Sequence, residues 1–432
     1  MNPQLVNSGV REMAYGSPYS YKGLASPVDE IGLSTPMMYG ANESLQLKLT
    51  QYPGPTPGYT HLILAENGFL YSFPINGTGQ MLKINPADGS FTQFGAMGAS
   101  DSFRGGVRGP NGKLYGIPSG STYVAVVDTN TDTITTIGLL SADLEKYAGG
   151  VLAPNGKIYC FPSRGSDILV IDTNTDTVSS IGTFFATSYS FKFTGGALAP
   201  NGKIYCVPGR ALNNTTGIGE RRVLVIDPSN DTYYFTDSIY SLNPPNMTAA
   251  TVSFVGANLV MNNKIYSIGW GMQCVLEINP ENDSLRFIPL KGFNGDRPMY
   301  PSVNGSFFPV SATSQLATNG KIYSQVGALP SVNTSLSDLV PYEFDTQAET
   351  FNKIFGCDIP ALSNITINTV NVASVPSIDM EGNLWFVGWR ANYIFKLSGF
   401  PPSTPEMYTM PPLEQLSTSL YNKFINKGNG VS

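Results

Sequence analysis

Short runs of alternating apolar and polar residues, separated by turn residues, dominate the chain. In the stretch that begins at Gly149 the runs are GGVLAP, KIYCFP, DILVIDT and TVSSIG. Alternation with a period of two is typical of half-buried strands. Asn155-Gly156 favours a tight hairpin between the first two runs, and Asn174-Thr175-Asp176 favours a turn between the last two. The pattern therefore predicts four short antiparallel strands, which we call a, b, c and d.

This four-strand template recurs along the chain. Its a–b turn is led by Asn67, Asn111, Asn155, Asn201, Asn262, Asn319 and Glu381. The spacing is about 44 residues in the tight copies and about 60 where loops are longer, which is the range of propeller repeats. A single sheet of this kind cannot bury both faces, whereas sheets packed around an axis can. The sequence predicts an all-β fold, a seven-bladed β-propeller. An open β-solenoid, the main alternative, usually has shorter periods.

The repeats also resemble known propeller sequences. The phrase ILVIDTNTDTVSSIG, preceded by APNGKIYCFP, resembles the YVTN-type repeat and the NGKIY repeats of propeller proteins from viruses, bacteriophages among them, and from bacteria. The resemblance covers roughly residues 59 to 400. It implies the propeller fold and leaves function open, since such propellers bind proteins, glycans or small molecules.

The two ends of the chain differ from the repeats. Residues 1–57 read as an extended N-terminal docking arm, residues 58–410 as the propeller, and residues 411–432 as a helix and tail. Aromatic and apolar residues in the arm favour docking on another surface over disorder: Tyr15, Tyr19, Tyr21, Met37 and Tyr39. Apolar residues of the last segment have the spacing of a short C-terminal amphipathic helix: Leu413, Leu416, Leu420 and Phe424.

The final strand of the seventh blade has two candidates. One is the run 406–410, directly after the last repeat, and the other is LQLKLTQ at 45–51, which would close the ring by joining the two ends of the chain. If the arm only docks, a truncation lacking residues 1–57 remains folded and no longer assembles.

Composition narrows the range of partners and catalytic sites that we expect for this chain. Charged residues are only 13%, Lys+Arg 25 against Asp+Glu 31 gives a net charge of −6, and no basic run is present, so nucleic acid is not an expected partner. The single histidine, His61, argues against zinc sites and Ser-His-Asp triads, although carboxylate-based hydrolysis stays open. The sequence contains no apolar run near 18 residues, so it predicts no membrane-spanning helix. We expect no enzymatic activity, no cofactor and no metal.

The d–a and b–c loops should share one face of the ring, at the mouth of the central channel. Candidate ligand- or partner-binding residues on this face are Tyr59, Phe103, Arg104, Tyr147, Arg164, Phe193, Arg210, Trp270, Trp389 and Arg390. Aromatic rings with nearby cations suit a glycan or an acidic, aromatic partner surface. In the alternative interpretation the aromatic residues only wedge between neighbouring blades.

The opposite face carries the a–b and c–d turns, which we interpret as structural. Asp128-x-Asn130-x-Asp132 imitates the start of a calcium loop, but the later glycine and glutamate of such loops are missing. The lysines that recur after the a–b turn, such as Lys113 and Lys157, read as solvated lysines that discourage edge pairing. Cys160 and Cys206 occupy equivalent positions in successive blades and are expected to be buried thiols.

These observations predict a non-catalytic structural or interaction protein. The specific hypothesis is a bacteriophage virion component, either a capsid decoration or a tail or fibre protein for host attachment, docked through its N-terminal arm. It would be made without a secretory signal in the host cytoplasm, and its partners would be other virion or scaffold proteins or a host-surface glycan. The alternatives are a carbohydrate-binding or carbohydrate-active propeller and a cellular protein–protein scaffold.

Overall fold

The computed structural model describes a large part of the chain. The described residues are 30–39, 43–51, 58–59, 61–76, 79–98, 101–183, 189–190, 192–209, 212–213, 221–242, 254, 256–269, 274–289, 311–317, 319–326, 341–353, 377–387 and 393–398. Within them the regular elements are strands, apart from one 3-10 turn, η1 (Ile239–Leu242). No helix in the described part is long and apolar enough to cross a membrane. The helix predicted within residues 411–432 lies outside the described residues.

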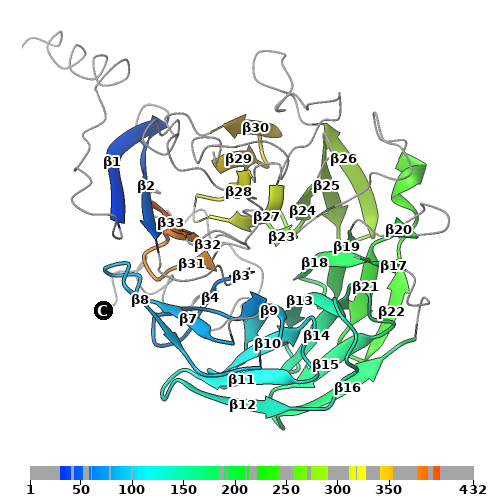
Figure 1. Ribbon diagram of the computed structural model, residues 1–432. Coiled ribbons are helices and arrows are strands. Elements are labelled where there is room, and N and C mark those ends of the chain that lie inside the picture. The colour runs from blue at the N-terminus through cyan, green and yellow to red at the C-terminus, as the bar shows by residue number, and fades with distance from the viewer. Residues whose placement is uncertain are drawn as a thin grey trace, which may run out of the picture.

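Seven antiparallel sheets stand side by side around a centre (Figure 1), which confirms the predicted seven-bladed β-propeller. Blade 1 is β4 (Ile63–Leu64), β5 (Leu70–Ser72), β7 (Met81–Ile84) and β8 (Phe91–Phe94); blade 2 is β9 (Phe103–Arg108), β10 (Leu114–Pro118), β11 (Val124–Asp128) and β12 (Thr133–Ile137); blade 3 is β13 (Tyr147–Leu152), β14 (Lys157–Pro162), β15 (Ile168–Asp172) and β16 (Thr177–Ile181).

The next three blades repeat this a–b–c–d order. Blade 4 is β18 (Phe193–Leu198), β19 (Ile204–Pro208), β21 (Leu224–Asp227) and β22 (Thr232–Phe235); blade 5 is β23 (Asn258–Leu259), β24 (Ile265–Ile268), β25 (Cys274–Asn279) and β26 (Ser284–Pro289); blade 6 is β27 (Ser311–Leu316), β28 (Ile322–Val326), β29 (Pro341–Asp345) and β30 (Thr350–Lys353). Two short strand pairs lie beside the blades: β3 (Gly58–Tyr59) with β6 (Pro74–Asn76), and β17 (Tyr189–Ser190) with β20 (Leu212–Asn213).

The seventh blade combines strands from the N-terminal and C-terminal parts of the chain. Its strands β31 (Ser377–Ile378), β32 (Leu384–Val387) and β33 (Tyr393–Ser398) are followed by β2 (Glu43–Gln51), and β1 (Glu30–Tyr39) adds a fifth, outer strand. The register of the closing pair runs from Gln46 opposite Ser398 to Gln51 opposite Tyr393. Of the two candidates, the N-terminal strand therefore occupies the place beside β33. The run 406–410 lies outside the described residues.

This closure changes the expectation for a truncated chain. Removing residues 1–57 would remove β2 as well as β1, and it would leave the backbone groups of β33 without their partner strand. The prediction that such a truncation remains folded is therefore no longer supported, because strands of the assigned arm are built into the last sheet.

Local turn chemistry explains the repeating sheets. In blade 3, Gly156 has a φ of 78° in the a–b turn and Asp176 has a φ of 51° in the c–d turn, so both adopt the left-handed conformation that tight turns need. The Asn155 side chain accepts a hydrogen bond from the Lys157 amide at 3.0 Å, which stabilises the a–b turn.

The a strands surround the centre (Figure 1) and contact one another in order from blade 7 through blade 1 to blade 6. They approach closely: a Cβ atom added to Gly195 would lie 2.5 Å from the Cα atom of Gly256 in the next blade. Glycine at this position therefore lets the innermost strands of blades 4 and 5 pack backbone against backbone.

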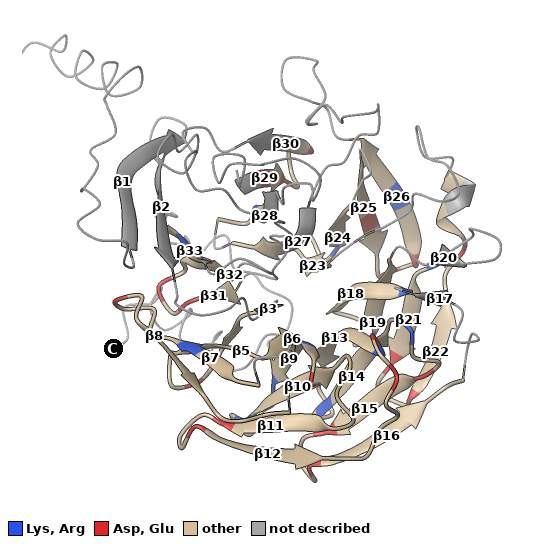
Figure 2. Ribbon diagram, viewed as in Figure 1, with Lys and Arg blue, Asp and Glu red and all other residues tan. Residues whose placement is uncertain are grey.

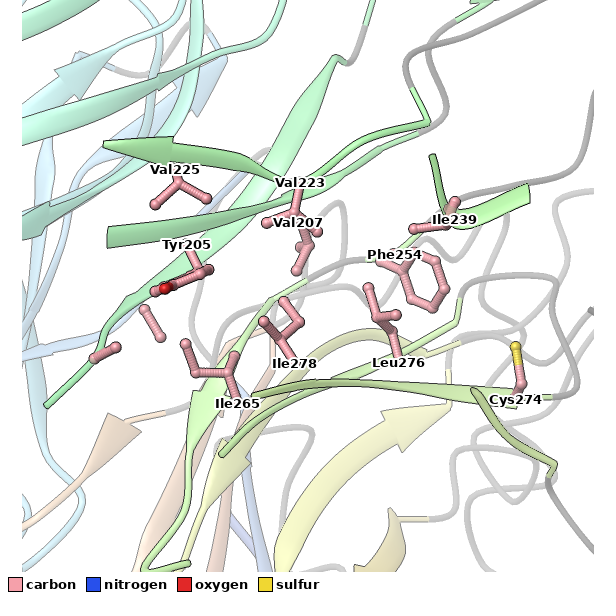
Figure 3. Packing of buried hydrophobic residues seen from close by; sticks show 12 residues of the cluster. Tyr205, Val207, Val223, Val225, Ile239, Phe254, Ile265, Cys274, Leu276 and Ile278 are labelled. Atoms are coloured by element: carbon pink, nitrogen blue, oxygen red, sulfur yellow. The ribbon is translucent and has the colours of Figure 1, made fainter. Parts of the chain in front are cut away.

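The hydrophobic core lies between neighbouring sheets. Figure 3 shows the cluster between blades 4 and 5, where Tyr205, Val207 and Val225 face Ile265, Leu276 and Ile278, all of them buried. Cys160 and Cys206 are buried free thiols, as predicted, and burial raises the pKa of both. Because each core is shared by two blades, no blade is self-sufficient.

Candidate functional site

The loops of the channel-mouth face form a cavity beside blade 3. The d–a loop of residues 138–146 and the b–c loop of residues 163–167 enclose it together with β16, and its volume is about 850 Å³. We call it the loop cavity. Its size lies within the range of pockets that bind ligands or partner side chains.

Two leucines of the d–a loop are unusually exposed. Leu139 is 90% exposed and Leu144 is 64% exposed, and both line the loop cavity. Among the described residues, the other large apolar side chain classed as exposed is Leu242, at 37%. Grouped apolar side chains that stay exposed beside a concavity mark a candidate binding surface, since monomers rarely expose contiguous apolar patches.

The d–a loop also carries the ionic contacts of this face. Glu145 has a φ of 57°, and its carboxylate lies 3.4 Å from the Arg104 guanidinium and 3.6 Å from that of Arg164. Arg104 is mostly buried, whereas the Arg164 side chain is 43% exposed and lines the loop cavity. Arg164 is therefore the accessible cation of the cavity.

Two buried lysines hold the loops in place. The Lys146 Nζ donates hydrogen bonds to the backbone oxygens of Ser121 at 2.9 Å and Asp143 at 2.8 Å. The Lys192 Nζ donates to the backbone oxygen of Arg164 at 3.1 Å. Burial, together with the nearby charge of Arg164, lowers the pKa of Lys192 to about 8. Both ammonium groups donate hydrogen bonds to backbone carbonyls, and these bonds position the cavity wall.

The candidate tyrosine and phenylalanine residues are buried. They pack in the cores between blades, as the alternative interpretation predicts: Tyr59, Phe103, Tyr147 and Phe193. Their rings do not form an exposed platform in this structure. The polar end of Tyr147 reaches the loop cavity, where its hydroxyl donates to Asp167 at 2.8 Å.

Several other candidates cannot be placed. Arg210, Trp270, Trp389 and Arg390 lie outside the described residues, as do Tyr15, Tyr19 and Tyr21 of the arm. Met37 and Tyr39 lie in β1, for which the backbone alone is described. Of the predicted binding residues, the structure brings Tyr147 and Arg164 together at the loop cavity, with Arg104 linked to Arg164 through Glu145.

Sequence reasoning missed Leu139 and Leu144. The available signal was three leucines, these two and Leu140, within LLSADLEK, a stretch that otherwise has loop character between two predicted strands. Periodicity selects residues that recur in every blade, and these leucines occur in one loop only.

The opposite face carries a repeated contact between blades. In blade 2 the Tyr115 hydroxyl donates to Asp176 of the next blade at 2.5 Å, and the Lys113 Nζ donates to the same carboxylate at 2.6 Å. We call this contact the Tyr–Asp latch. Among the residues that the structure describes, it occurs four times, with the pairs Tyr71–Asp132, Tyr115–Asp176, Tyr159–Asp231 and Tyr205–Asp283. Lys113 and Lys157 are thus ion-paired across blades, which differs from the solvated role that we expected.

The aspartate side chains of the calcium-like motif accept structural hydrogen bonds. Asp128 accepts a hydrogen bond from the Asn130 amide at 2.9 Å, and Asp132 accepts from Tyr71 and Lys83 of the preceding blade. Figure 2 shows that acidic positions recur in the turns between the outer strands. In the described part of the chain, no three His, Cys, Asp or Glu side chains are grouped so that they could hold a metal ion.

No family model matches the chain, and no curated protein does. Among solved structures, it is similar to a streptogramin B lyase, with 13% identity over 82% of this chain and 97% of that one and a TM-score of 0.57. It is also similar to a catalytically inactive histidine variant of virginiamycin B lyase from Staphylococcus aureus with quinupristin, with 11% identity, 82% and 99% coverage and a TM-score of 0.57.

A third similar structure is the extracellular domain of a hybrid two component system from B. thetaiotaomicron, with 11% identity and a TM-score of 0.53. There the alignment covers 84% of this chain and 41% of the other. At such identities the likeness shows the fold alone: this chain is a seven-bladed β-propeller.

The prediction that the chain is not an enzyme is contradicted by the lyase structures, since enzymes stand among the structures most similar to it. Neither the fold nor a low histidine count therefore excludes catalysis, and the likeness assigns no reaction to this chain. His61 itself lies against Gly105 of the next blade, and burial, with the charge of Arg104, lowers its pKa to about 3. His61 is therefore neutral near pH 7.

Proposed function

We propose that this protein is an interaction propeller that binds a protein partner at the loop cavity. The observation that carries the proposal is the pair of exposed leucines, Leu139 and Leu144, at the edge of a concavity of about 850 Å³ that also contains an accessible arginine. Apolar groups surrounded by polar ones, with an arginine nearby, are the usual anatomy of a protein interface.

We further propose that the partner belongs to a virus particle, with this chain as a capsid decoration or as a tail or fibre protein for host attachment. Support for this part comes from the sequence: the NGKIY repeats resemble those of viral propellers, bacteriophage proteins among them, and the chain has low charge. Because β1 and β2 already pair within blade 7, docking by the arm would involve the residues before Glu30.

The test uses purified virus particles grown with variant chains. We expect the unaltered chain in the particle and a strong reduction when Leu139 and Leu144 are both replaced by serine. Leu242→Ser is the matched control, since Leu242 is an exposed leucine outside the loop cavity.

Two results would contradict the proposal. Equal incorporation of the Leu139/Leu144 variant and the control would remove the loop cavity from the interface. Absence of the unaltered chain from particles would end the virion role. Binding to a glycan array would then favour the carbohydrate-binding alternative, and specific capture of a host protein would favour the cellular scaffold.

A further inference from the structure

Arg164 is the polar group of the loop cavity with most capacity for a new partner. Within the described residues, Glu145 is the carboxylate within ion-pair distance of its guanidinium, at 3.6 Å. That separation is longer than the 2.7–2.9 Å typical of a charge-assisted hydrogen bond. Glu145 also serves Arg104, at 3.4 Å. One carboxylate thus divides its interaction between two guanidinium groups, and neither contact is short.

The acidic groups of the cavity have other partners close by. Asp167 accepts the hydrogen bond from the Tyr147 hydroxyl at 2.8 Å. Asp143 lies near the buried Lys146, whose ammonium group is bonded to the backbone oxygen of Asp143 and is influenced by its charge. A second ammonium group, that of Lys192, is bonded to the backbone oxygen of Arg164. The other basic groups near Arg164 are Arg104, Lys146 and Lys192, and the carboxylates are Asp143, Glu145 and Asp167, so Arg164 itself leaves one positive charge in excess for an incoming anion.

The same cavity offers apolar contacts. Leu139 and Leu144 line it and are largely exposed, and Val178 contributes from β16. A ligand that satisfies both features has a planar acidic group for the guanidinium fork and an aliphatic or aromatic group beside it.

We propose that the loop cavity takes an acidic segment of a protein partner, with an Asp or Glu carboxylate on Arg164 and a neighbouring apolar side chain on Leu139 and Leu144. This inference rests on the proposed function, and it adds the chemistry that the partner must present. Arg164 acts as the specificity-determining residue, and Glu145 holds its side chain until the partner carboxylate replaces it.

The direct test measures binding of blocked hexapeptides to the full chain. One set carries Asp or Glu next to Leu or Phe, and a matched set carries Asn or Gln in place of the acids. We expect the acidic set to bind and the amide set to bind at least about tenfold more weakly, because the amide carries no charge for Arg164. Raising the salt concentration should weaken the acidic set only.

Variants assign the effect to the cavity. Arg164→Ala should lower affinity for the acidic set about tenfold or more, and Arg164→Lys should restore part of it, since lysine keeps the charge but loses the fork. Arg222→Ala is the matched control, because Arg222 packs over the Phe235 ring and does not line the cavity. Native folding of each variant is checked by its thermal transition.

Each outcome decides between the hypotheses. Equal binding of both peptide sets, undiminished binding by Arg164→Ala, or no binding at millimolar peptide would overturn the inference. Binding of a uronic-acid oligosaccharide in place of the peptides would overturn it in favour of a glycan. If Leu139 and Leu144 variants lose virion incorporation while Arg164→Ala keeps it, the proposed function stands and the acidic-segment inference fails.

Discussion

The two halves of the ring are held together differently. Between blades 1 and 5, each b-strand tyrosine reaches across a blade boundary to an aspartate in the next c–d turn, as Tyr115 does to Asp176. In blades 5 and 6 the hydroxyls of the equivalent tyrosines bond to a glutamate of the same blade: Tyr266 donates to Glu277 at 3.0 Å and Tyr323 to Glu343 at 2.7 Å.

One sequence position accounts for the difference. The residue opposite the repeat tyrosine on strand c is Lys83 in blade 1 and Val126, Val170 and Val225 in blades 2 to 4, but Glu277 and Glu343 in blades 5 and 6. Lysine and valine offer no carboxylate, so the tyrosine hydroxyl bonds to an aspartate of the next blade, whereas glutamate provides a carboxylate within the same blade.

The boundary between blades 5 and 6 carries other contacts. Arg286 of blade 5 pairs with Glu349 of blade 6 at 2.6 Å, and the Asn258 side chain donates a hydrogen bond to the Ser314 hydroxyl at 2.7 Å. The repeat tyrosine hydroxyls thus join neighbouring blades in the early ring and stabilise single blades in blades 5 and 6, while β2 completes the sheet of blade 7.

The largest expected loss of stability follows from removing β2, the strand that completes blade 7. Deletion of residues 1–51 removes β1 and β2, and β33 loses a pairing register of six residues. At about 1 kcal/mol for each net backbone hydrogen bond, the loss is on the order of 5 kcal/mol, a large share of a typical stability. Chemical denaturation should show a lower midpoint or no cooperative transition.

The control deletion removes residues 1–29 and leaves both strands. It should unfold like the full chain in the same denaturation experiment. If the longer deletion is as stable as this control, closure by β2 does not stabilise the ring.

The second effect concerns the carboxylate within blade 5. Glu277 is nearly buried and accepts hydrogen bonds from Lys264 at 2.9 Å and from Arg286. Glu277→Gln should lower the free energy of unfolding by about 2 to 3 kcal/mol, less than for a fully buried pair because both cations are partly exposed. Glu281→Gln, an exposed carboxylate of the same blade, should change it little. Similar losses in both variants would show that the Glu277 pairs add nothing.

Lowering the pH should remove the difference in stability between the wild type and Glu277→Gln. Burial would raise the pKa of Glu277, but hydrogen bonds from Arg286, Lys264 and Tyr266 outweigh it and lower the pKa to about 2. The folded-state pKa is depressed, so the stabilisation is complete above the ordinary value near 4.5 and is lost as the pH falls toward 2. The gap between wild type and Glu277→Gln, measured by thermal unfolding, should therefore shrink over this range. A gap independent of pH would mean that the carboxylate charge is not the cause.

The smallest effect is expected at a Tyr–Asp latch. Asp176→Asn weakens the bonds from Tyr115 and Lys113, whose side chains approach from the neighbouring blade, and should cost about 1 kcal/mol because the pair with Lys113 is partly exposed. Asp237→Asn serves as the exposed control.

A double-mutant cycle sharpens this last test. Tyr115→Phe and Asp176→Asn should show a coupling of about 0.5 to 1 kcal/mol in denaturation experiments. Strict additivity of the two changes would indicate that the tyrosine and aspartate do not stabilise each other across the blade boundary.

The blade repeat could be predicted from the sequence because the patterns that produce it are local. Alternation of apolar residues and the turn residues Asn155, Gly156 and Asp176 act within a few positions of one another, so each sheet and the number of blades could be predicted. Arg164 was predicted to lie on the channel-mouth face for the same reason, since strand direction sorts the loops. The buried thiols Cys160 and Cys206 were predicted because equivalent positions of adjacent blades are too far apart for a disulfide.

Tertiary structure alone decided what depends on neighbours distant in sequence. Asp176 meets Tyr115 from 61 residues away, and β2 meets β33 from the other end of the chain. The aromatic ring of Phe103 is covered by the adjacent sheet, which no property of its own strand reveals. Leu139 and Leu144 become a candidate site because the loops around them leave a concavity, and that shape depends on how blade 3 packs. Local patterns specify elements, while the contacts between elements are set by packing of the whole ring.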